Sequence, residues 1–247
     1  MTGSVALVTG GARRIGAHLV KSLHQRGWRV IIHFHESDDE ALELCQALNK
    51  VRPASAAQVQ GNLCNLNDIR KIASKALDAF GQVDVLINNA SSFFPTPIGD
   101  IDNTQWDLLM GSNVKGALFL SQALHDTLKE QKGLILNLVD MHIDRPLPNH
   151  SVYCAAKSAL ASVTRSLAGE LAPSVRVNGI APGAILWPER TMSEAEKNAL
   201  LASIPLNKLG SPEVIAHAMH YLLEASYVTG QILYVDGGRS IASNASA

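Results

Sequence analysis

The sequence predicts an α/β fold built on one Rossmann-type, doubly wound parallel sheet with helices on both faces. Short apolar or β-branched runs alternate with longer segments of helical periodicity along the 247 residues. The apolar runs are continuous, as expected of strands that are buried on both faces. Because no repeat or Pro/Ser-rich linker interrupts the pattern, we expect 1–247 to form a single domain, with a cofactor half of about 1–135 and a catalytic and substrate half of about 136–247.

Local patterns predict the individual elements in chain order. Apolar runs predict strands over 5–9, 29–35, 56–60, 83–90, 133–139, 175–180 and 231–238. Helical periodicity predicts helices over about 15–27, 38–51, 67–80, 104–129 and 152–171. Gly27 predicts the end of the first helix, and acidic residues at the start of the second favour a helix N-terminus.

The composition is that of an ordinary globular protein, with 47% hydrophobic and 17% charged residues. A net charge of −1 gives no reason to expect a nucleic acid or a membrane as a partner, and no apolar stretch reaches the ~18 residues of a membrane span. The first residues lack the basic leader of a signal peptide. Cys45, Cys64 and Cys154 lie outside any CxxC pattern, so we expect reduced thiols in a cytoplasmic protein.

A glycine-rich stretch, TGGARRIG, lies between the first strand and the first helix. Backbone N–H groups at such a turn, together with the helix dipole, can hold a pyrophosphate. Arg14 stands where the usual spacing has a glycine, but adjacent guanidiniums can pair with phosphate oxygens. The alternative is a plain strand-to-helix turn. We predict that the cofactor-binding residues of this turn are Gly10, Arg13, Arg14, Ile15 and Gly16.

The stretch HFHES follows the second strand, where the adenosine ribose of a dinucleotide is recognised. His35 and Ser37, with the nearby arginines, suit the 2′-phosphate of NADP, whereas Glu36 opposes it. His33 and His35 occupy alternate strand positions that could suggest a metal pair. Since no further ligand cluster supports one, we predict no metal site.

The stretch NNASSFFPTP (88–97) follows the fourth strand. Its small residues let the backbone approach a ligand closely, and its two prolines stiffen the loop. Phe93 and Phe94 are either anchored in the core or form a stacking platform for a planar substrate. The stretch alone does not separate these alternatives.

Tyr153 and Lys157 are four residues apart on a predicted helix, so both side chains lie on one face. A lysine ammonium near a phenol favours the phenolate. We therefore expect the pKa of Tyr153 to be lowered from about 10, so that the pair can deliver a proton. Asp140 follows the fifth strand, either as part of this chemistry or as a surface acid.

These motifs resemble those of the short-chain dehydrogenase/reductase family over nearly the whole chain. The resemblance implies a Rossmann fold and hydride transfer with a nicotinamide cofactor. It implies Tyr153 as the proton donor, Lys157 as the holder of the nicotinamide ribose, and Asn113 as the support of a proton-relay water. Besides Tyr153 and Lys157, the cofactor contacts that it implies are Asn89 and Ala90 in NNA and the Pro182–Gly183 pair.

Three departures from the common pattern of that family resemble pteridine reductases, a subgroup that reduces pterins and folates with NADPH. Arg14 replaces a glycine, NNASSFFPTP follows the fourth strand, and Asp140 stands where most members have a serine. The resemblance implies that Arg14 lies by the cofactor phosphates and the pterin, and that Asp140 takes part in proton transfer. It implies that Ser91 and Phe93 contact and stack on the pterin. Asn62 replaces an aspartate that contacts adenine, and an amide can make the same contact.

The chemistry of the residues agrees with this resemblance. A carboxylate repels the lone pairs of a carbonyl oxygen but pairs with N–H donors and can relay a proton to a ring nitrogen. We therefore expect NADPH-dependent reduction of dihydropterin to tetrahydropterin, and also of oxidised pterins and folates, with Tyr153 or Asp140 protonating the ring. The alternatives are a carbonyl reductase acting on 3-oxoacyl groups and a non-catalytic NADP(H)-binding protein.

Two further expectations concern the surroundings of the site. The loop 185–192 should cover the substrate, and Trp187 and Pro188 could shape its pocket. Members of the family are commonly tetrameric, so the resemblance implies a homotetramer.

Overall fold

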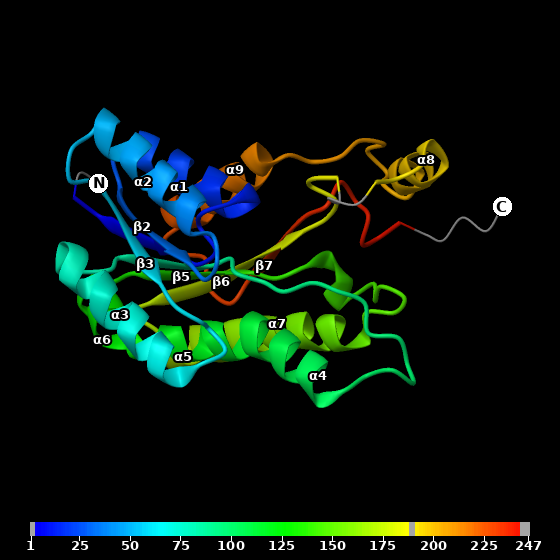
Figure 1. Cartoon of the computed structure of the whole chain (residues 1–247), viewed down its shortest axis with the longest axis horizontal. Helices are drawn as coiled ribbons and strands as arrows, with labels where there is room; N and C mark the ends of the chain where they lie inside the picture. Colours follow the sequence, from blue (N-terminus) through cyan, green and yellow to red (C-terminus); the bar gives the residue numbers. More distant parts are fainter. Residues whose placement is uncertain (1–2, 188–190, 243–247) are drawn as a thin grey trace.

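The computed structural model describes residues 3–187 and 191–242, and seven strands form one parallel sheet in the order β3-β2-β1-β4-β5-β6-β7 (Figure 1). The strands are β1 (Val5–Val8), β2 (Arg29–Phe34), β3 (Ala56–Gln60), β4 (Val85–Asn88), β5 (Leu134–Leu138), β6 (Arg176–Pro182) and β7 (Ile232–Val235). Each lies where an apolar run predicts it. The predicted fold class, a doubly wound parallel sheet with helices on both faces, is confirmed.

Two layers of helices cover the sheet (Figure 1). One layer comprises α1 (Arg14–Gln25), α2 (Asp38–Val51) and α9 (Pro212–Glu224). The other comprises α3 (Leu66–Phe80), α4 (Asn103–Met110), α5 (Gly116–Ala123), α6 (His125–Glu130) and α7 (Ser151–Glu170). None of the helices in the described ranges combines the length and the apolarity needed to cross a membrane.

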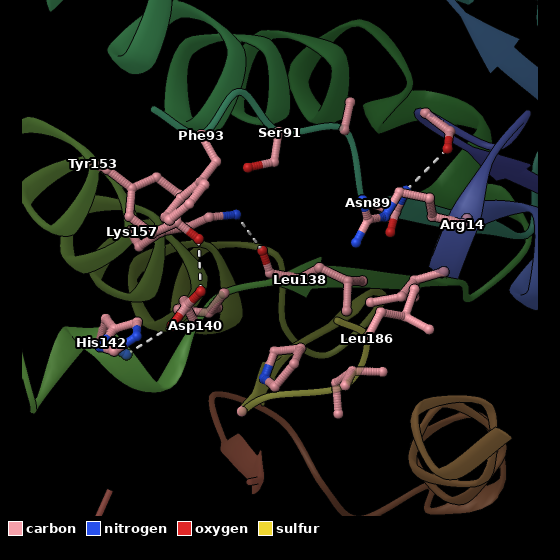
Figure 2. Close-up of a pocket in the computed structure, with 18 of the residues that line it drawn as sticks. Arg14, Asn89, Ser91, Phe93, Leu138, Asp140, His142, Tyr153, Lys157 and Leu186 are labelled. Atoms are coloured by element: carbon pink, nitrogen blue, oxygen red, sulfur yellow. Dashed lines mark hydrogen bonds between the residues drawn. The ribbon is translucent and has the colours of Figure 1, made fainter. Parts of the chain in front are cut away.

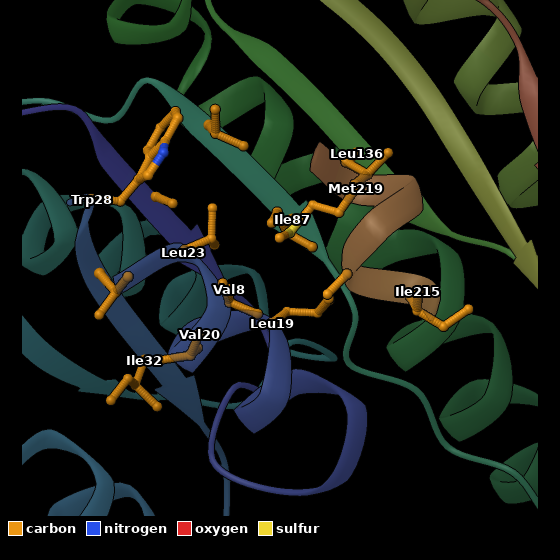
Figure 3. Packing of buried hydrophobic residues seen from close by; sticks show 14 of the residues in the cluster. Val8, Leu19, Val20, Leu23, Trp28, Ile32, Ile87, Leu136, Ile215 and Met219 are labelled. Atoms are coloured by element: carbon orange, nitrogen blue, oxygen red, sulfur yellow. The ribbon is translucent and has the colours of Figure 1, made fainter. Parts of the chain in front are cut away.

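Successive side chains of each strand pack into opposite helix layers, because a strand alternates the faces to which its residues point. In β1, Val8 belongs to the cluster that contains Leu19 of α1 and Met219 of α9 (Figure 3). Its neighbour Leu7 belongs to a second cluster on the other face, with Ile72 of α3. Since both faces of the sheet are covered, the ends of the strands are the part of it that a ligand can reach.

The described residues include two helices, α8 and α9, beyond those predicted from the sequence. α9 begins with Ser211 and Pro212, a proline at the first helical turn, and buries residues such as Ile215 against the sheet. α8 (Glu194–Ala202) begins with a capping box in which Ser193 and Glu196 satisfy each other's backbone N–H groups, and it contains no buried residue. Without an apolar stripe, α8 gives no periodic signal.

The segment predicted as one helix over 104–129 is helical, but it is not one regular α-helix. The structure divides this segment into α4, a π-helix η1 (Gly111–Lys115), α5 and α6. The Asn113 side chain donates from Nδ2 to the Leu109 carbonyl at 2.9 Å, and this carbonyl lies four residues back, where the backbone of a regular helix would bond. Such competition favours a wider local turn, and turns of this kind are frequent at functional sites.

Candidate active site

The carboxyl ends of the strands form a cleft at the point where the strand order reverses, between β1 and β4 (Figure 2). Its volume is about 880 Å³. The lining comes from the turn after β1, the loop after β4, the end of β5, α7 and the segment after β6. These residues are Gly10, Arg13, Arg14, Ile15, Gly16, Asn89, Ala90, Ser91, Phe93, Leu138, Val139, Asp140, His142, Tyr153, Lys157, Pro182, Gly183, Ala184, Ile185 and Leu186. Most of the predicted site residues therefore lie together in one cavity.

The glycine-rich turn has no room for side chains at its glycines. Gly10 has a φ of 59°, in the left-handed region that favours glycine, and a Cβ on Gly16 would lie 2.1 Å from the Gly10 carbonyl oxygen. Asn89 Nδ2 donates to the Thr9 and Gly10 carbonyls at 2.9 and 3.1 Å, which ties the loop after β4 to the turn. The backbone ahead of α1 can thus come close to a ligand.

Arg14 lines the cleft with a left-handed φ of 50°. A residue with a side chain is strained there by roughly 1–2 kcal/mol, and a glycine would relieve that strain. Such strain persists where the surrounding structure requires it, often at binding sites. The Arg14 guanidinium brings positive charge to the end of the cleft at which a pyrophosphate would lie.

A phenol, a carboxylate and an ammonium converge at the other end of the cleft (Figure 2). Tyr153 Oη donates to Asp140 Oδ2 at 2.6 Å, and Lys157 Nζ donates to the Leu138 carbonyl at 2.9 Å. Asp140 Oδ1 accepts from the His142 backbone N–H at 2.8 Å, so Asp140 also caps the short helix η2 (Met141–Ile143). This cap fixes the direction of the carboxylate, which faces Tyr153.

The prediction that Lys157 lowers the pKa of Tyr153 is wrong. Burial and then the adjacent Asp140 carboxylate raise the pKa of Tyr153 well above its ordinary value of 10.0. Burial lowers the pKa of Lys157 to about 8, although Asp140 acts in the opposite direction. Lys157 Nζ points at Leu138 and lies 5.8 Å from the centroid of the Tyr153 ring, whereas Asp140 is at hydrogen-bond distance. Tyr153 therefore keeps its proton at neutral pH.

Asn113 is buried behind the cleft and is hydrogen-bonded to Ser91. Asn113 Oδ1 accepts from Ser91 Oγ at 2.7 Å, while its Nδ2 donates to the Leu109 and Ser92 carbonyls at 2.9 and 3.0 Å. While the Ser91 hydroxyl donates its hydrogen to Asn113, its oxygen can accept from a ligand. The support of a relay water by Asn113 stays a prediction.

Phe93 stands at the cleft with 57% of its surface exposed. One face stacks on the His150 ring, with centroids 4.7 Å apart and an interplanar angle of 15°, and Tyr153 meets the ring edge-on at 4.8 Å. Phe94 instead packs against a buried cluster that includes Leu109. Phe94 is thus anchored in the core, whereas Phe93 is exposed at the cleft, and its stacking on a planar substrate stays a prediction.

The loop that carries Phe93 is joined to the start of α7. Thr96 is buried, and its backbone N–H donates to the Asn149 carbonyl at 2.6 Å. Its Oγ1 accepts from the Val152 backbone N–H at 3.4 Å. Because α7 also carries Tyr153, the aromatic platform and the phenol belong to one wall of the cleft.

Three residues predicted to bind the adenosine end do not line the cleft. His35 and Ser37 follow β2, and Asn62 follows β3, along the same edge of the sheet. His35 Nδ1 lies 3.6 Å from the Glu36 carboxylate, and Asn62 Oδ1 accepts from the Cys64 backbone N–H at 2.8 Å. Their contacts with a cofactor stay predictions.

The cleft also includes residues that the motifs do not identify: Leu138, Val139, His142, Ala184, Ile185 and Leu186. His142 is signalled only by its place two residues after Asp140. Ile185 and Leu186 belong to the loop expected to cover the substrate, whereas Trp187 is not among the lining residues. Pro188 lies outside the described residues.

The cleft fits a nicotinamide dinucleotide. A turn too crowded for side chains precedes α1, arginine side chains stand beside it, and a proton-bearing phenol lies at the far end. A doubly wound sheet with this arrangement at its switch point defines a dinucleotide-dependent oxidoreductase.

Comparison with known proteins agrees with that class. A family model described as enoyl-(acyl carrier protein) reductase matches residues 10–240. The chain is 35% identical to pteridine reductase 1 of Leishmania tarentolae over 282 aligned positions, which cover 97% of each chain. It is 34% identical to the uncharacterized oxidoreductase YohF of Escherichia coli, over 97% of this chain and 96% of that protein. It is 29% identical to the 3-oxoacyl-[acyl-carrier-protein] reductase FabG of Staphylococcus epidermidis, over 94% of this chain and 97% of that protein.

The chain therefore belongs to the short-chain dehydrogenase/reductase family, as its motifs predict. Members of this family are oxidoreductases that use NAD(H) or NADP(H). The relatives differ in the substrates that their names state, so the family alone does not define the substrate of this protein.

Replacing Lys157 by Met should stabilise the fold. The pKa of Lys157 falls from 10.5 to about 8 on folding, so the buried ammonium destabilises the fold at pH 7. That penalty is relieved as pH rises from about 8 to 10.5, because the folded state then loses its proton first. Lys157→Met should therefore raise the free energy of unfolding by about 1–3 kcal/mol at pH 7, and by less at pH 10.

Denaturant unfolding at the two pH values measures this difference. The control is Lys115→Met, because Lys115 Nζ also donates to a carbonyl, that of Cys64, from an exposed position. A Lys157 variant that is less stable than the wild type at pH 7 would contradict the prediction.

Proposed function

We propose that the protein reduces pterins with NADPH, taking dihydropterin to tetrahydropterin, and that oxidised pterins and folates are further substrates. The observation that carries the proposal is the carboxylate of Asp140 at 2.6 Å from the Tyr153 phenol, at the end of the cleft. The 35% identity to a pteridine reductase over nearly the whole chain supports it.

The acceptor groups in the cleft favour a nitrogen ring over a simple ketone. Asp140 has two oxygens that can each accept more than one hydrogen bond, and the Ser91 oxygen is an acceptor toward a ligand. A ketone oxygen offers these groups only lone pairs, whereas a pterin presents N–H donors. Phe93 keeps one ring face on His150, and its opposite face can stack on a flat ring.

A bound NADPH would supply the hydride, which by resemblance goes to C6 of the pterin. The glycine-rich turn with Arg13 and Arg14 would hold the pyrophosphate, and Lys157 the nicotinamide ribose. Tyr153 keeps its proton until hydride transfer to C6 places an electron pair on the adjacent ring nitrogen, N5 in a dihydropterin, which then takes the proton. Asp140 orients the phenol and relays a proton from solvent that replaces the one Tyr153 loses; in the alternative route, Asp140 takes up a proton from solvent and delivers it to N5 itself.

The experiment that tests this function follows NADPH oxidation with four substrates in parallel: dihydrobiopterin, dihydrofolate, an oxidised pterin and a 3-oxoacyl ester. We expect the highest kcat/KM with dihydrobiopterin. Turnover of the ester alone would replace the proposal by a 3-oxoacyl reductase, the class to which the FabG relative belongs. Binding of NADPH without turnover of any of the four would indicate a non-catalytic dinucleotide-binding protein.

Removing the charge of Asp140 should affect turnover far more than cofactor binding. Asn or Ser at this position can still accept from the His142 backbone N–H and so keep the cap of η2. We expect Asp140→Asn and Asp140→Ser to lower kcat/KM for dihydropterin about 100-fold or more. The Kd of NADPH should change by less than about threefold.

Asp144→Asn is the matched control, because Asp144 ends the same short helix and accepts from the Tyr234 hydroxyl without lining the cleft. Pterin turnover that survives Asp140→Asn at the wild-type rate would remove this carboxylate from the mechanism.

The preference for NADPH is proposed on the charges beside the adenosine end of the site. Arg13 and Arg14 line the cleft, and His35 and Ser37 follow β2. Glu36 opposes this preference: its side chain is 85% exposed, so water screens but does not remove its effect on a 2′-phosphate.

Reversing the charge of Glu36 should therefore strengthen the preference for NADPH. We expect Glu36→Arg to lower the KM for NADPH about three- to tenfold and to leave the KM for NADH within about twofold. Asp126→Arg, the same charge change at an exposed position on α6, is the control. If Glu36→Arg and Asp126→Arg change the KM for NADPH equally, Glu36 does not act on the 2′-phosphate from a nearby position.

A homotetramer, a cytoplasmic location and a single-domain organisation complete the proposal. Each rests on the resemblance of the motifs to those of the family and on the composition of the chain.

A further inference from the structure

His33 is a buried histidine that lies behind the cleft and is held at both ring nitrogens. It lies on β2 and is 2% exposed. Its Nδ1 is 3.3 Å from the backbone nitrogen of Gly10, and its Nε2 is 3.1 Å from the carbonyl oxygen of Gly61. Its own carbonyl accepts from the Gly11 backbone N–H at 2.9 Å.

These contacts require one form of the imidazole. The Gly10 N–H can only donate, so Nδ1 must accept, and the Gly61 carbonyl can only accept, so Nε2 must carry the hydrogen. An imidazolium would place an N–H against the N–H of Gly10. Burial lowers the pKa of His33 to about 4, which agrees with a neutral ring, and His35 acts in the same direction.

The two glycines belong to different parts of the proposed dinucleotide site. Gly10 lies in the turn that lines the cleft, at the pyrophosphate end. Gly61 directly precedes Asn62, the residue expected to contact adenine, and a Cβ on Gly61 would lie 2.7 Å from Ile72. Since neither glycine has a side chain that could hold it in place, the His33 ring is the side chain that links the turn to the segment after β3.

We propose that His33 is a positioning residue for the dinucleotide: its neutral ring fixes the separation between the turn at Gly10 and the segment at Gly61. His33 does not line the cleft, so it acts on cofactor binding through these two backbone contacts. The proposal depends on dinucleotide binding, which the family establishes, and is independent of which substrate is reduced.

The chain offers a close control in His24. It is 5% exposed, its Nε2 is 2.7 Å from Ser55 Oγ, and burial lowers its pKa as well. His24 is in the last turn of α1, and Ser55 precedes β3, so this pair lies at the edge of the sheet opposite the cleft. If only packing were lost, His33→Leu and His24→Leu should change the Kd of NADPH by similar factors.

The experiment measures the Kd of NADPH by quenching of protein fluorescence, together with KM and kcat for the substrate that the wild type reduces fastest. We expect His33→Leu to raise the Kd and the KM of NADPH about tenfold and to change kcat by less than about twofold. His24→Leu should leave the Kd within about twofold of the wild type. His33→Asn should recover part of the affinity, because its Oδ1 can replace Nδ1 as the acceptor for Gly10.

Equal effects of His33→Leu and His24→Leu on the Kd would overturn the proposal, and so would a fall in kcat with an unchanged KM. If His33→Leu does not fold, the Kd of NADPH for His33→Asn and for His33→Gln tests the proposal instead. A Kd that is raised more in His33→Gln, which can reach Gly61 but not Gly10, supports the proposal, and a wild-type Kd in both overturns it. The Kd needs no turnover, so a failure of the pterin assay leaves this test intact.

Discussion

The hydrogen bond from Tyr153 to Asp140 is the interaction on which the chemistry of the cleft depends. Two oxygens 2.6 Å apart share one proton, and removing it would leave two negative oxygens side by side in a half-buried place. The Tyr153 phenol therefore stays protonated. An atom that gains negative charge when its neighbour accepts a hydride can take the proton, and the Lys157 ammonium is the positive charge that can offset the loss.

The fold holds this pair in place through elements that are far apart in the sequence. β5 ends two residues before Asp140, whose side chain caps a short helix, while α7 presents Tyr153 and Lys157 on one face. The glycine-rich turn after β1 reaches the same edge of the sheet because parallel strands end together. The phenol–carboxylate pair and the glycine-rich turn thus line one cavity, although they come from different elements.

Much of this arrangement follows from local sequence patterns. Continuous apolar runs identify the strands, and the spacing of Tyr153 and Lys157 identifies a helix face. The direction of the pKa shift of Tyr153 does not follow, because it depends on burial and on a residue from another element. The π-helix at Asn113 does not follow either: the Asn113 side chain is hydrogen-bonded to the Leu109 carbonyl there, and hydrophobic periodicity does not detect such bonds. α8 buries no residue, so its sequence has no apolar stripe from which the helix could be predicted.

The contacts of Thr96 have a consequence for how the cavity can adapt to its ligands. They fasten the loop carrying Phe93 to the beginning of α7, so this loop cannot shift without disturbing the phenol. Differences in ligand size must then be absorbed on the opposite side, where Ile185 and Leu186 follow the end of β6. Selectivity for bulkier or smaller molecules should consequently evolve by exchange of these two aliphatic residues, while the stacked aromatic side remains as it is.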